Sequence, residues 1–309
     1  MIKIGIIGVG SVGSSVLYAL GLKGVADEIV LVDVNEAKAK ADAQDMFDAG
    51  LFLPHKTKFT VGDYCDLKDC DIIIHTAGKI SLLRESRNRD AELNFTVPMV
   101  RSYIPKIKES GFNGIFINVT NPCDVLTREF DKGLGLPKGH VFGTGTGLDT
   151  ARLVAQLEKE TGISAKNINA YMIGEHGNSQ MCSWSNVRFG GVSLENTSFG
   201  FDPKEMQQRA AQGGWVTFSG KFCTEFAIAC CAVNDAIAVI HDEKKIIPAS
   251  ISLDGKYGQE NVYAGVPCVI GKNGVEKIVE LDLTEEEKEE FNACCDSIRA
   301  NIEKADKLV

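Results

Sequence analysis

Residues 3–13 read Lys3-Ile4-Gly5-Ile6-Ile7-Gly8-Val9-Gly10-Ser11-Val12-Gly13, an apolar run that leads directly into the pattern G-x-G-x-x-G. Such a strand–turn–helix unit can direct backbone N–H groups at a pyrophosphate. Gly8 would permit the tight turn, Gly10 the close approach of the pyrophosphate, and Gly13 the packing of the following helix on the strand. The alternative is a glycine-rich turn without a ligand, since 31 glycines make a chance match easy. The apolar strand before the pattern and the helix after it favour a dinucleotide site.

One acidic residue discriminates between the two common nicotinamide dinucleotides. Asp33 lies 20 residues beyond Gly13, at the end of the second expected strand. A carboxylate at this place accepts hydrogen bonds from the ribose hydroxyls and repels a 2′-phosphate. The next three residues, Val34, Asn35 and Glu36, supply no cation. The sequence therefore predicts NAD rather than NADP as the cofactor.

Around this motif, the first 145 residues alternate apolar runs with helical stretches. Strands are expected over residues 3–7, 28–32, 58–61, 71–75, 115–119 and 141–142, with helices over 14–22 and 35–47. Runs such as Ile72-Ile73-Ile74 are apolar throughout, which is typical of parallel strands covered by helices on both faces. The pattern predicts an α/β fold with a Rossmann-type doubly wound parallel sheet.

The pattern changes after Gly147. Helices are expected over residues 148–160, 202–212 and 224–241, and antiparallel strands around 184–189 and 267–270. Asp202-Pro203 is a typical helix start, and Thr284-Glu285-Glu286-Glu287 is a capping-box sequence. An apolar stripe at helical spacing follows it: Phe291, Cys294, Cys295, Ile298 and Ile302. We expect an NAD-binding Rossmann domain at residues 1–145 and an α+β substrate-binding catalytic domain at 146–309.

Composition excludes several classes of protein. Hydrophobic residues make up 44% and charged residues 24%, and the net charge is -9, so neither wholesale disorder nor a nucleic-acid partner is expected. No apolar run approaches the roughly 20 residues that span a bilayer, and no signal peptide is apparent at the N-terminus. The ten cysteines fall mostly in apolar segments, as in Cys230-Cys231, and form no C-x-x-C pair. A cytoplasmic protein with buried, reduced thiols and no metal site is the expectation.

An enzyme that oxidises an alcohol needs a group to take the hydroxyl proton, and histidine suits that task at neutral pH. Among five histidines, His176 lies in Gly174-Glu175-His176-Gly177, where the flanking glycines permit an unusual backbone and a close substrate. We interpret the other four as structural: His55, His75, His140 and His241. On patterning alone, a structural role for His176 stays open as well.

The chain resembles the lactate/malate dehydrogenase superfamily, and within it the L-lactate and L-2-hydroxyisocaproate dehydrogenases. The resemblance covers essentially the whole chain and is carried by six motifs in order: Gly8–Gly13, Thr76-Ala77-Gly78, Asn121-Pro122 with Asp124, Gly147–Arg152, Gly174–Gly177 and Lys221–Ile228. It implies an NAD-dependent dehydrogenase that interconverts small L-2-hydroxy acids and 2-oxo acids. It also implies a homotetramer or a homodimer.

The resemblance also assigns roles to residues. His176 is similar to the acid/base that exchanges a proton with the C2 oxygen, and Asp149 to the carboxylate that orients it. Arg152 is similar to the bidentate clamp for the substrate carboxylate. Without the motif, Asp149 and Arg152 would be interpreted as an ordinary i, i+3 surface ion pair. Arg89 resembles the mobile arginine that closes over the substrate, although Arg87 and Arg84 are neighbours that could be mistaken for it.

Further contacts are implied on both sides of the nicotinamide. Asn121 resembles a residue that contacts nicotinamide and substrate, Thr224 a substrate contact, and Ile228 a nicotinamide contact. The cofactor site would also include Val12, Thr76, Ala77 and Gly78.

Two departures from the family concern substrate size and charge. The substrate-reading segment 79–88 is shorter than in typical members, so the discriminating position falls at Ser81 or at Leu83. Neither is arginine, which disfavours the second carboxylate of malate, although Arg84 lies one residue from Leu83. Gly213-Gly214 stands where relatives carry side chains. This pair would widen the pocket for branched acids, as in the L-2-hydroxyisocaproate enzymes, or would mark a helix irregularity.

A third departure concerns regulation. Val154 and Asn169 occupy the positions of the arginine and histidine of members that fructose 1,6-bisphosphate activates, so we expect no such activation. Two rival functions remain: a malate dehydrogenase, and a catalytically idle NADH-binding sensor or structural protein. An idle protein would be expected to have lost a catalytic histidine, aspartate or arginine, and this chain retains them.

Overall fold

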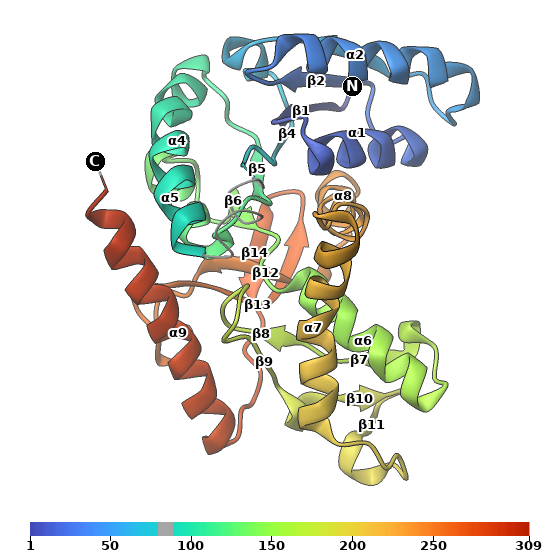
Figure 1. Ribbon diagram of the computed structural model, residues 1–309, viewed down its shortest axis with the longest axis vertical. Coiled ribbons are helices and arrows are strands. Elements are labelled where there is room, and N and C mark those ends of the chain that lie inside the picture. The colour runs from blue at the N-terminus through green and yellow to red at the C-terminus, as the bar shows by residue number, and fades with distance from the viewer. Residues whose placement is uncertain (80–88, 309) are drawn as a thin grey trace.

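A nine-stranded sheet forms the centre of the molecule (Figure 1). The structure is a computed structural model, which describes residues 1–79 and 89–308. Six strands from the first half pair in parallel in the order β6-β5-β4-β1-β2-β3. Their bounds are β1 (Lys3–Ile7), β2 (Glu28–Val32), β3 (Lys58–Val61), β4 (Ile72–His75), β5 (Ile115–Asn118) and β6 (Val141–Gly143). This is the strand order of a doubly wound dinucleotide-binding sheet, so the predicted fold class is confirmed.

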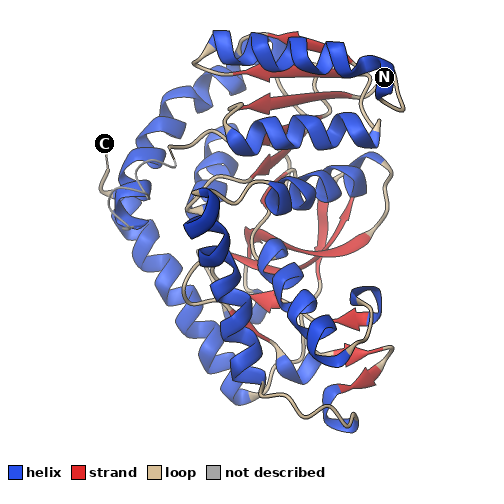
Figure 2. Cartoon of the chain, turned by 45° about the vertical axis from the view of Figure 1, so that its right-hand side comes forward, coloured by secondary structure: helices blue, strands red, loops and turns tan. Residues whose placement is uncertain are grey.

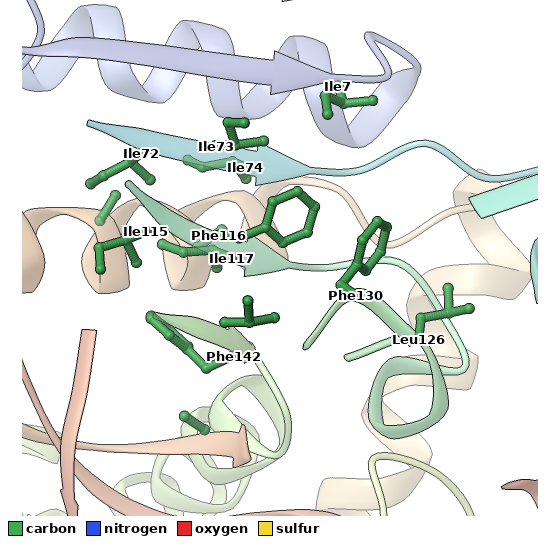
Figure 3. Packing of buried hydrophobic residues seen from close by; sticks show 14 of the residues in the cluster. Ile7, Ile72, Ile73, Ile74, Ile115, Phe116, Ile117, Leu126, Phe130 and Phe142 are labelled. Atoms are coloured by element: carbon green, nitrogen blue, oxygen red, sulfur yellow. The ribbon is translucent and has the colours of Figure 1, made fainter. Parts of the chain in front are cut away.

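Helices flank the parallel strands on opposite sides (Figure 1). They are α1 (Ser11–Lys23), α2 (Glu36–Asp48), α4 (Arg89–Ser110) and α5 (Cys123–Leu134). The middle strands are buried along their whole length, and Phe116 of β5 packs on Phe130 of α5 with ring centroids 4.4 Å apart (Figure 3). Burial on both faces explains why these strands are apolar throughout rather than alternating.

Three antiparallel strands from the second half extend the same sheet beyond β6. They are β12 (Lys245–Ser252), β13 (Tyr263–Gly271) and β14 (Gly274–Ile278). Within the sheet, the join between the two halves is narrow, since β12 pairs with β6 through the single residue pair Ser250 and Gly143. The strand expected around 267–270 is the second half of the longer strand β13.

The second half adds four long helices, a small three-stranded sheet (β11-β10-β7) and one pair of short strands (β8-β9). The helices are α6 (Gly147–Thr161), α7 (Pro203–Lys221), α8 (Phe226–Ile240) and α9 (Glu285–Asp306), which runs along one side of the molecule (Figure 2). The small strands are β7 (Ile168–Asn169), β8 (Met172–Ile173), β9 (Met181–Cys182), β10 (Arg188–Phe189) and β11 (Val192–Ser193). Single turns of 3-10 helix complete the chain: Ala49–Phe52, Tyr64–Leu67, Ala165–Asn167, Trp184–Asn186, Leu194–Asn196 and Lys256–Gly258.

The predicted helix starts are confirmed. The Asp202 side chain accepts a hydrogen bond from the backbone N–H of Lys204, and Thr284 forms a reciprocal capping box with Glu287. The apolar stripe of α9 is buried. This mixture of helices and short antiparallel strands confirms the expected class of the second half.

Two local expectations were wrong. Residues 184–189 do not form one strand, because the Asn186 side chain donates to the Ser183 hydroxyl at 2.6 Å and closes a 3-10 turn before the short β10. Cys230 is exposed, because it falls on the outer face of α8, between the buried positions Ala229 and Ala232. All ten thiols are free, and seven of them are buried. Within residues 1–79 and 89–308, no helix is long and apolar enough to cross a membrane.

Candidate active site

The glycine motif forms a tight turn between β1 and α1. Gly8 has φ +89°, and a Cβ added to Gly13 would lie 2.0 Å from the Gly8 carbonyl oxygen. The Thr76 hydroxyl donates to the same oxygen at 2.5 Å. By contrast, apart from its own chain neighbours, no heavy atom of the described residues lies within 4 Å of a Cβ added to Gly10. The loop is therefore closed where it packs and open where a pyrophosphate would approach.

Asp33 braces this loop at the end of β2. Its Oδ2 accepts the Val9 N–H at 2.6 Å, and its Oδ1 accepts the Asn35 N–H at 2.7 Å. Lys38, the first cation after Asp33, is bound instead to the carboxylate of Asp42 and, at 2.8 Å, to the hydroxyl of Ser14. A carboxylate at the ribose position and an engaged lysine both fit NAD better than NADP.

The other predicted cofactor residues lie at the same edge of the sheet. Thr76, Ala77 and Gly78 follow β4, and Asn121 follows β5, joined to Pro122 by a cis peptide bond. The Thr120 hydroxyl donates to the Ala77 carbonyl at 2.9 Å and links the two segments. Because the carboxyl ends of parallel strands line one crevice, these residues and the glycine loop fit a dinucleotide such as NAD.

His176, Asp149 and Arg152 come together at the start of α6. Nδ1 of His176 lies 2.6 Å from Oδ2 of Asp149, and Nη1 of Arg152 lies 3.1 Å from Oδ1 of the same carboxylate. The Asp149 side chain is 2% exposed, whereas those of His176 and Arg152 are each 19% exposed. The aspartate is thus shielded from solvent, while the two basic groups remain accessible to a ligand.

The ionisation of Asp149 follows from its neighbours. Burial favours the neutral acid and would raise its pKa, but the charge and hydrogen bond of His176, with the charge of Arg152, outweigh burial and hold the pKa below its usual range. Asp149 is therefore a carboxylate at neutral pH. A carboxylate there favours a cationic imidazole, which is what a proton acceptor becomes during the reaction.

The loop that carries His176 is fixed at several points. Gly174, with φ +94°, exchanges two backbone hydrogen bonds of 2.9 and 2.8 Å with Gly265 of β13. The Glu175 carboxylate accepts the Ser179 hydroxyl at 2.7 Å. The backbone N–H of His176 donates to Asp124 at 2.9 Å. Asp124 belongs to the Asn-Pro-Cys-Asp segment that leads into α5, one of the motifs that carry the family resemblance, and no local pattern predicts its contact with His176.

Gly213 and Gly214 lie against Arg152. A Cβ added to Gly213 would be 3.7 Å from Cδ of Arg152, and one added to Gly214 would be 3.3 Å from both Nη atoms. The reading of this pair as a helix irregularity is wrong, because α7 continues through both residues to Lys221. Packing of α7 on α6 explains why the helix extends beyond residue 212, where the sequence suggested that it would end.

The remaining predicted site residues lie at the ends of helices or in the segment after β4. Thr224 precedes α8, and Ile228 lies in its first turn; both are half-buried, and α8 packs on α1. Arg89 is the first residue of α4. Ser81 and Leu83 lie outside the described residues.

Three of the four histidines interpreted as structural have partners outside this group, and His241 directly follows α8. His75 is fully buried, hydrogen-bonded to Asn118 at 2.9 Å and to Tyr103 at 2.5 Å, and desolvation lowers its pKa to about 4. His55 contacts Asp27, and His140 contacts the Gly114 carbonyl. Over residues 1–79 and 89–308, no group of three or more His, Cys, Asp or Glu side chains could hold a metal ion.

Comparison with known families agrees with this geometry along the whole chain. The lactate/malate dehydrogenase NAD-binding domain matches residues 2–143, and the lactate/malate dehydrogenase alpha/beta C-terminal domain matches residues 146–309. The chain belongs to the lactate/malate dehydrogenase family. As a member, it is an NAD-dependent oxidoreductase that acts on the CH–OH group of L-2-hydroxy acids.

Individual relatives are bacterial lactate dehydrogenases. The L-lactate dehydrogenase of Fusobacterium nucleatum is 38% identical over 97% of this chain and 96% of its own. L-lactate dehydrogenase 1 of Bifidobacterium longum is 35% identical over 97% of each chain. Among solved structures, the minor L-lactate dehydrogenase of Enterococcus mundtii superposes with a TM-score of 0.94 at 29% identity and 98% coverage of each chain. A lactate dehydrogenase from a deep-sea metagenome gives 0.93 at 32% identity and 99% coverage of each chain.

Proposed function

We propose that His176 is the acid/base of this dehydrogenase, that Asp149 orients it, and that Arg152 binds the substrate carboxylate. The observation that carries the proposal is the shared carboxylate of Asp149, which contacts both basic side chains at 2.6 and 3.1 Å. With one imidazole and one guanidinium held on the same group, a 2-hydroxy acid can present its hydroxyl to the first and its carboxylate to the second.

In the oxidation direction, neutral His176 takes the proton of the C2 hydroxyl, and Asp149 stabilises the imidazolium that forms. Arg152 fixes the acid through two parallel hydrogen bonds, which a planar guanidinium supports better than an ammonium. We assign the dinucleotide to the glycine loop, Asp33, Asn121 and Ile228; when bound, it supplies the hydride acceptor or donor. Arg89 would close over the substrate from the start of α4.

We further propose that the substrates are of the L-lactate and L-2-hydroxyisocaproate type. The relatives named L-lactate dehydrogenase support lactate, and the absence of side chains at Gly213 and Gly214, where an added Cβ would contact Arg152, supports longer side chains. Ser81 and Leu83 supply no arginine for the second carboxylate of oxaloacetate. We expect the same site to reduce pyruvate and branched 2-oxo acids.

The deciding experiment is NADH oxidation at 340 nm with pyruvate, 2-oxo-4-methylpentanoate, phenylpyruvate and oxaloacetate, with His176→Asn as the control for the chemistry. Longer acids that match pyruvate in kcat/KM would support the wide pocket. A tenfold preference for pyruvate, about 1.4 kcal/mol, would contradict it. A preference for oxaloacetate would instead identify a malate dehydrogenase. Fructose 1,6-bisphosphate, added to the same assay, is expected to leave the half-saturating pyruvate concentration unchanged.

We also propose a homotetramer or homodimer, located in the cytoplasm, with its domain boundary between residues 145 and 146. Exposed apolar side chains support association: Phe47, Leu51 and Phe52 near the end of α2, and Val216 and Phe226 on α7 and α8. The two family matches, which end at 143 and begin at 146, support the boundary, and the free thiols support a reducing compartment. Light scattering on the purified protein tests the oligomeric state directly.

A further inference from the structure

We propose that Asp124 is a positioning residue that fixes the backbone of His176 and supplies a second negative charge behind its imidazole. The inference rests on the proposed role of His176 as acid/base. Asp124 lies in the first turn of α5 and is 3% exposed. Its Oδ2 accepts the backbone N–H of His176 at 2.9 Å, and its Oδ1 accepts the hydroxyl of Ser250 at 2.5 Å.

These two hydrogen bonds join the halves of the chain. Asp124 follows Asn121 by three residues at the carboxyl edge of the parallel sheet, whereas His176 and Ser250 come from the second half. The hydrogen bond to Asp124 therefore fixes the position of the His176 backbone relative to the segment that carries Asn121. The bonds of Gly174 to Gly265 fix the same loop only to other parts of the second half.

Burying an ionised carboxylate to accept two hydrogen bonds costs desolvation free energy. Desolvation raises the pKa of Asp124 to about 6, although the bonds from Ser250 and His176 oppose the rise. An asparagine of the same shape could accept the His176 N–H and donate to Ser250 without that cost. Hydrogen bonding alone therefore does not explain why this position carries a charged side chain. A negative charge near His176 favours the imidazolium.

Other charges act on the same histidine. Asp149 of α6 contacts its ring and is itself paired with Arg152, while Glu175 precedes His176 and lines a small cavity with Asp124, His176 and Asn301 of α9. The thiols of Cys123 and Cys295 interact electrostatically with Asp124, and burial raises the pKa of both to about 12. Within the part of the chain that the structure describes, the carboxyl groups of Asp149, Glu175 and Asp124 therefore lie around His176.

The test compares Asp124→Asn and Asp124→Ala with Asp131→Asn as the matched control. Asp131 is a half-buried carboxylate on the same helix, and it accepts a hydrogen bond from the Tyr263 hydroxyl at 2.6 Å. For each variant, we would measure the pH profile of kcat/KM for hydroxy acid oxidation, kcat at its optimum, and the Kd of NADH by fluorescence titration.

Asp124→Asn keeps the hydrogen bonds but removes the charge. We expect kcat within about threefold of the parent and the acidic midpoint of the pH profile displaced to lower pH, because neutral His176 is then available at lower pH. Asp124→Ala removes both, and we expect kcat to fall by about tenfold or more with the Kd of NADH within twofold. Asp131→Asn should move neither the midpoint nor kcat.

An unchanged midpoint in Asp124→Asn would overturn the electrostatic part, and this variant decides the question even if Asp124→Ala does not fold. An unchanged kcat in folded Asp124→Ala would overturn the positioning part. Failure of the proposed function is recognised separately, since His176→Asn would then retain activity whatever the Asp124 variants do.

Discussion

The imidazole of His176 and the carboxylate of Asp149 are joined by a 2.6 Å contact between Nδ1 and Oδ2, although 27 residues separate them in the chain. Asp149 is almost fully buried, so solvent cannot replace it as the partner of the ring. The contact fixes both the orientation of the imidazole and the nitrogen that faces the substrate.

Replacing Asp149 with asparagine should therefore cost far more than one hydrogen bond. The amide keeps the size of the side chain but no longer stabilises an imidazolium, and it can favour the wrong tautomer of His176. We expect kcat to fall by about 10²–10⁴-fold, with the Kd of NADH little changed. Single-turnover kinetics with NADH and pyruvate would measure this, and a loss below threefold would contradict the role assigned to Asp149.

Arg152→Lys tests the carboxylate clamp. Lysine keeps the positive charge but loses the planar pair of donors, so we expect a weaker grip on the substrate carboxylate. The expected loss is about 30-fold or more in kcat/KM for 2-oxo acids, about 2 kcal/mol, expressed mainly in KM. Arg209→Lys, on an exposed surface of α7, is the matched control. If the two variants have equal kcat/KM, Arg152 does not bind the substrate.

Coenzyme choice should depend on Asp33 and, behind it, on Asp42. Asp33→Ser removes the charge that repels a 2′-phosphate, and we expect the kcat/KM ratio of NADPH to NADH to rise at least tenfold. Adding Asp42→Asn should raise the ratio further, because Lys38 loses its carboxylate partner and can turn to the phosphate. Steady-state kinetics with both cofactors on the single and double variants measures this. No gain from the second substitution would show that Lys38 does not reach the 2′ position.

Asp235 should make the stability of the fold depend on pH. This residue of α8 is fully buried, and neither carboxylate oxygen has a hydrogen-bond partner among the described residues. Desolvation raises its pKa well above the usual value, so the folded protein binds a proton that the unfolded chain has released.

The stability contribution of protonated Asp235 is complete below the unfolded pKa, near 4, and is lost as pH rises towards the folded pKa, by about 1.4 kcal/mol per pH unit. Asp235→Asn cannot ionise, so its free energy of unfolding should exceed that of the parent increasingly as pH rises from 5 to 8. Urea denaturation across that range measures the difference. A gap that stays constant with pH would mean that Asp235 does not titrate in the fold.

Sequence patterns predicted the parallel half of this fold closely because its strands are buried on both faces. Strands such as Ile72–His75 carry their signal in composition alone, and the glycine motif fixes where the first helix begins. Likewise, Thr284 and Glu287 mark the start of α9 by local hydrogen bonds that the sequence displays directly.

Prediction failed where contacts between distant segments decide the structure. Helix α7 passes through Gly213 and Gly214, since packing on α6 compensates for two poor helix formers. The role inferred for Asp124 depends on the spatial meeting of α5, the His176 loop and β12, which no local pattern shows. His176 and Asp149 required the family resemblance, because their spacing along the chain has no meaning without the fold.

The narrow join between β12 and β6 limits insertions and deletions in β12. Side chains alternate between the two faces of a strand, so inserting or deleting one residue in β12 before Ser250 would turn its hydroxyl away from Asp124 and present an apolar neighbour. Such a change would break the Ser250–Asp124 hydrogen bond and so disturb the position of His176, although the loop that carries His176 would keep its own sequence. Insertions and deletions compatible with activity should therefore gather in the turns that follow residues 253 and 271, while the segment 245–252 keeps a constant number of residues.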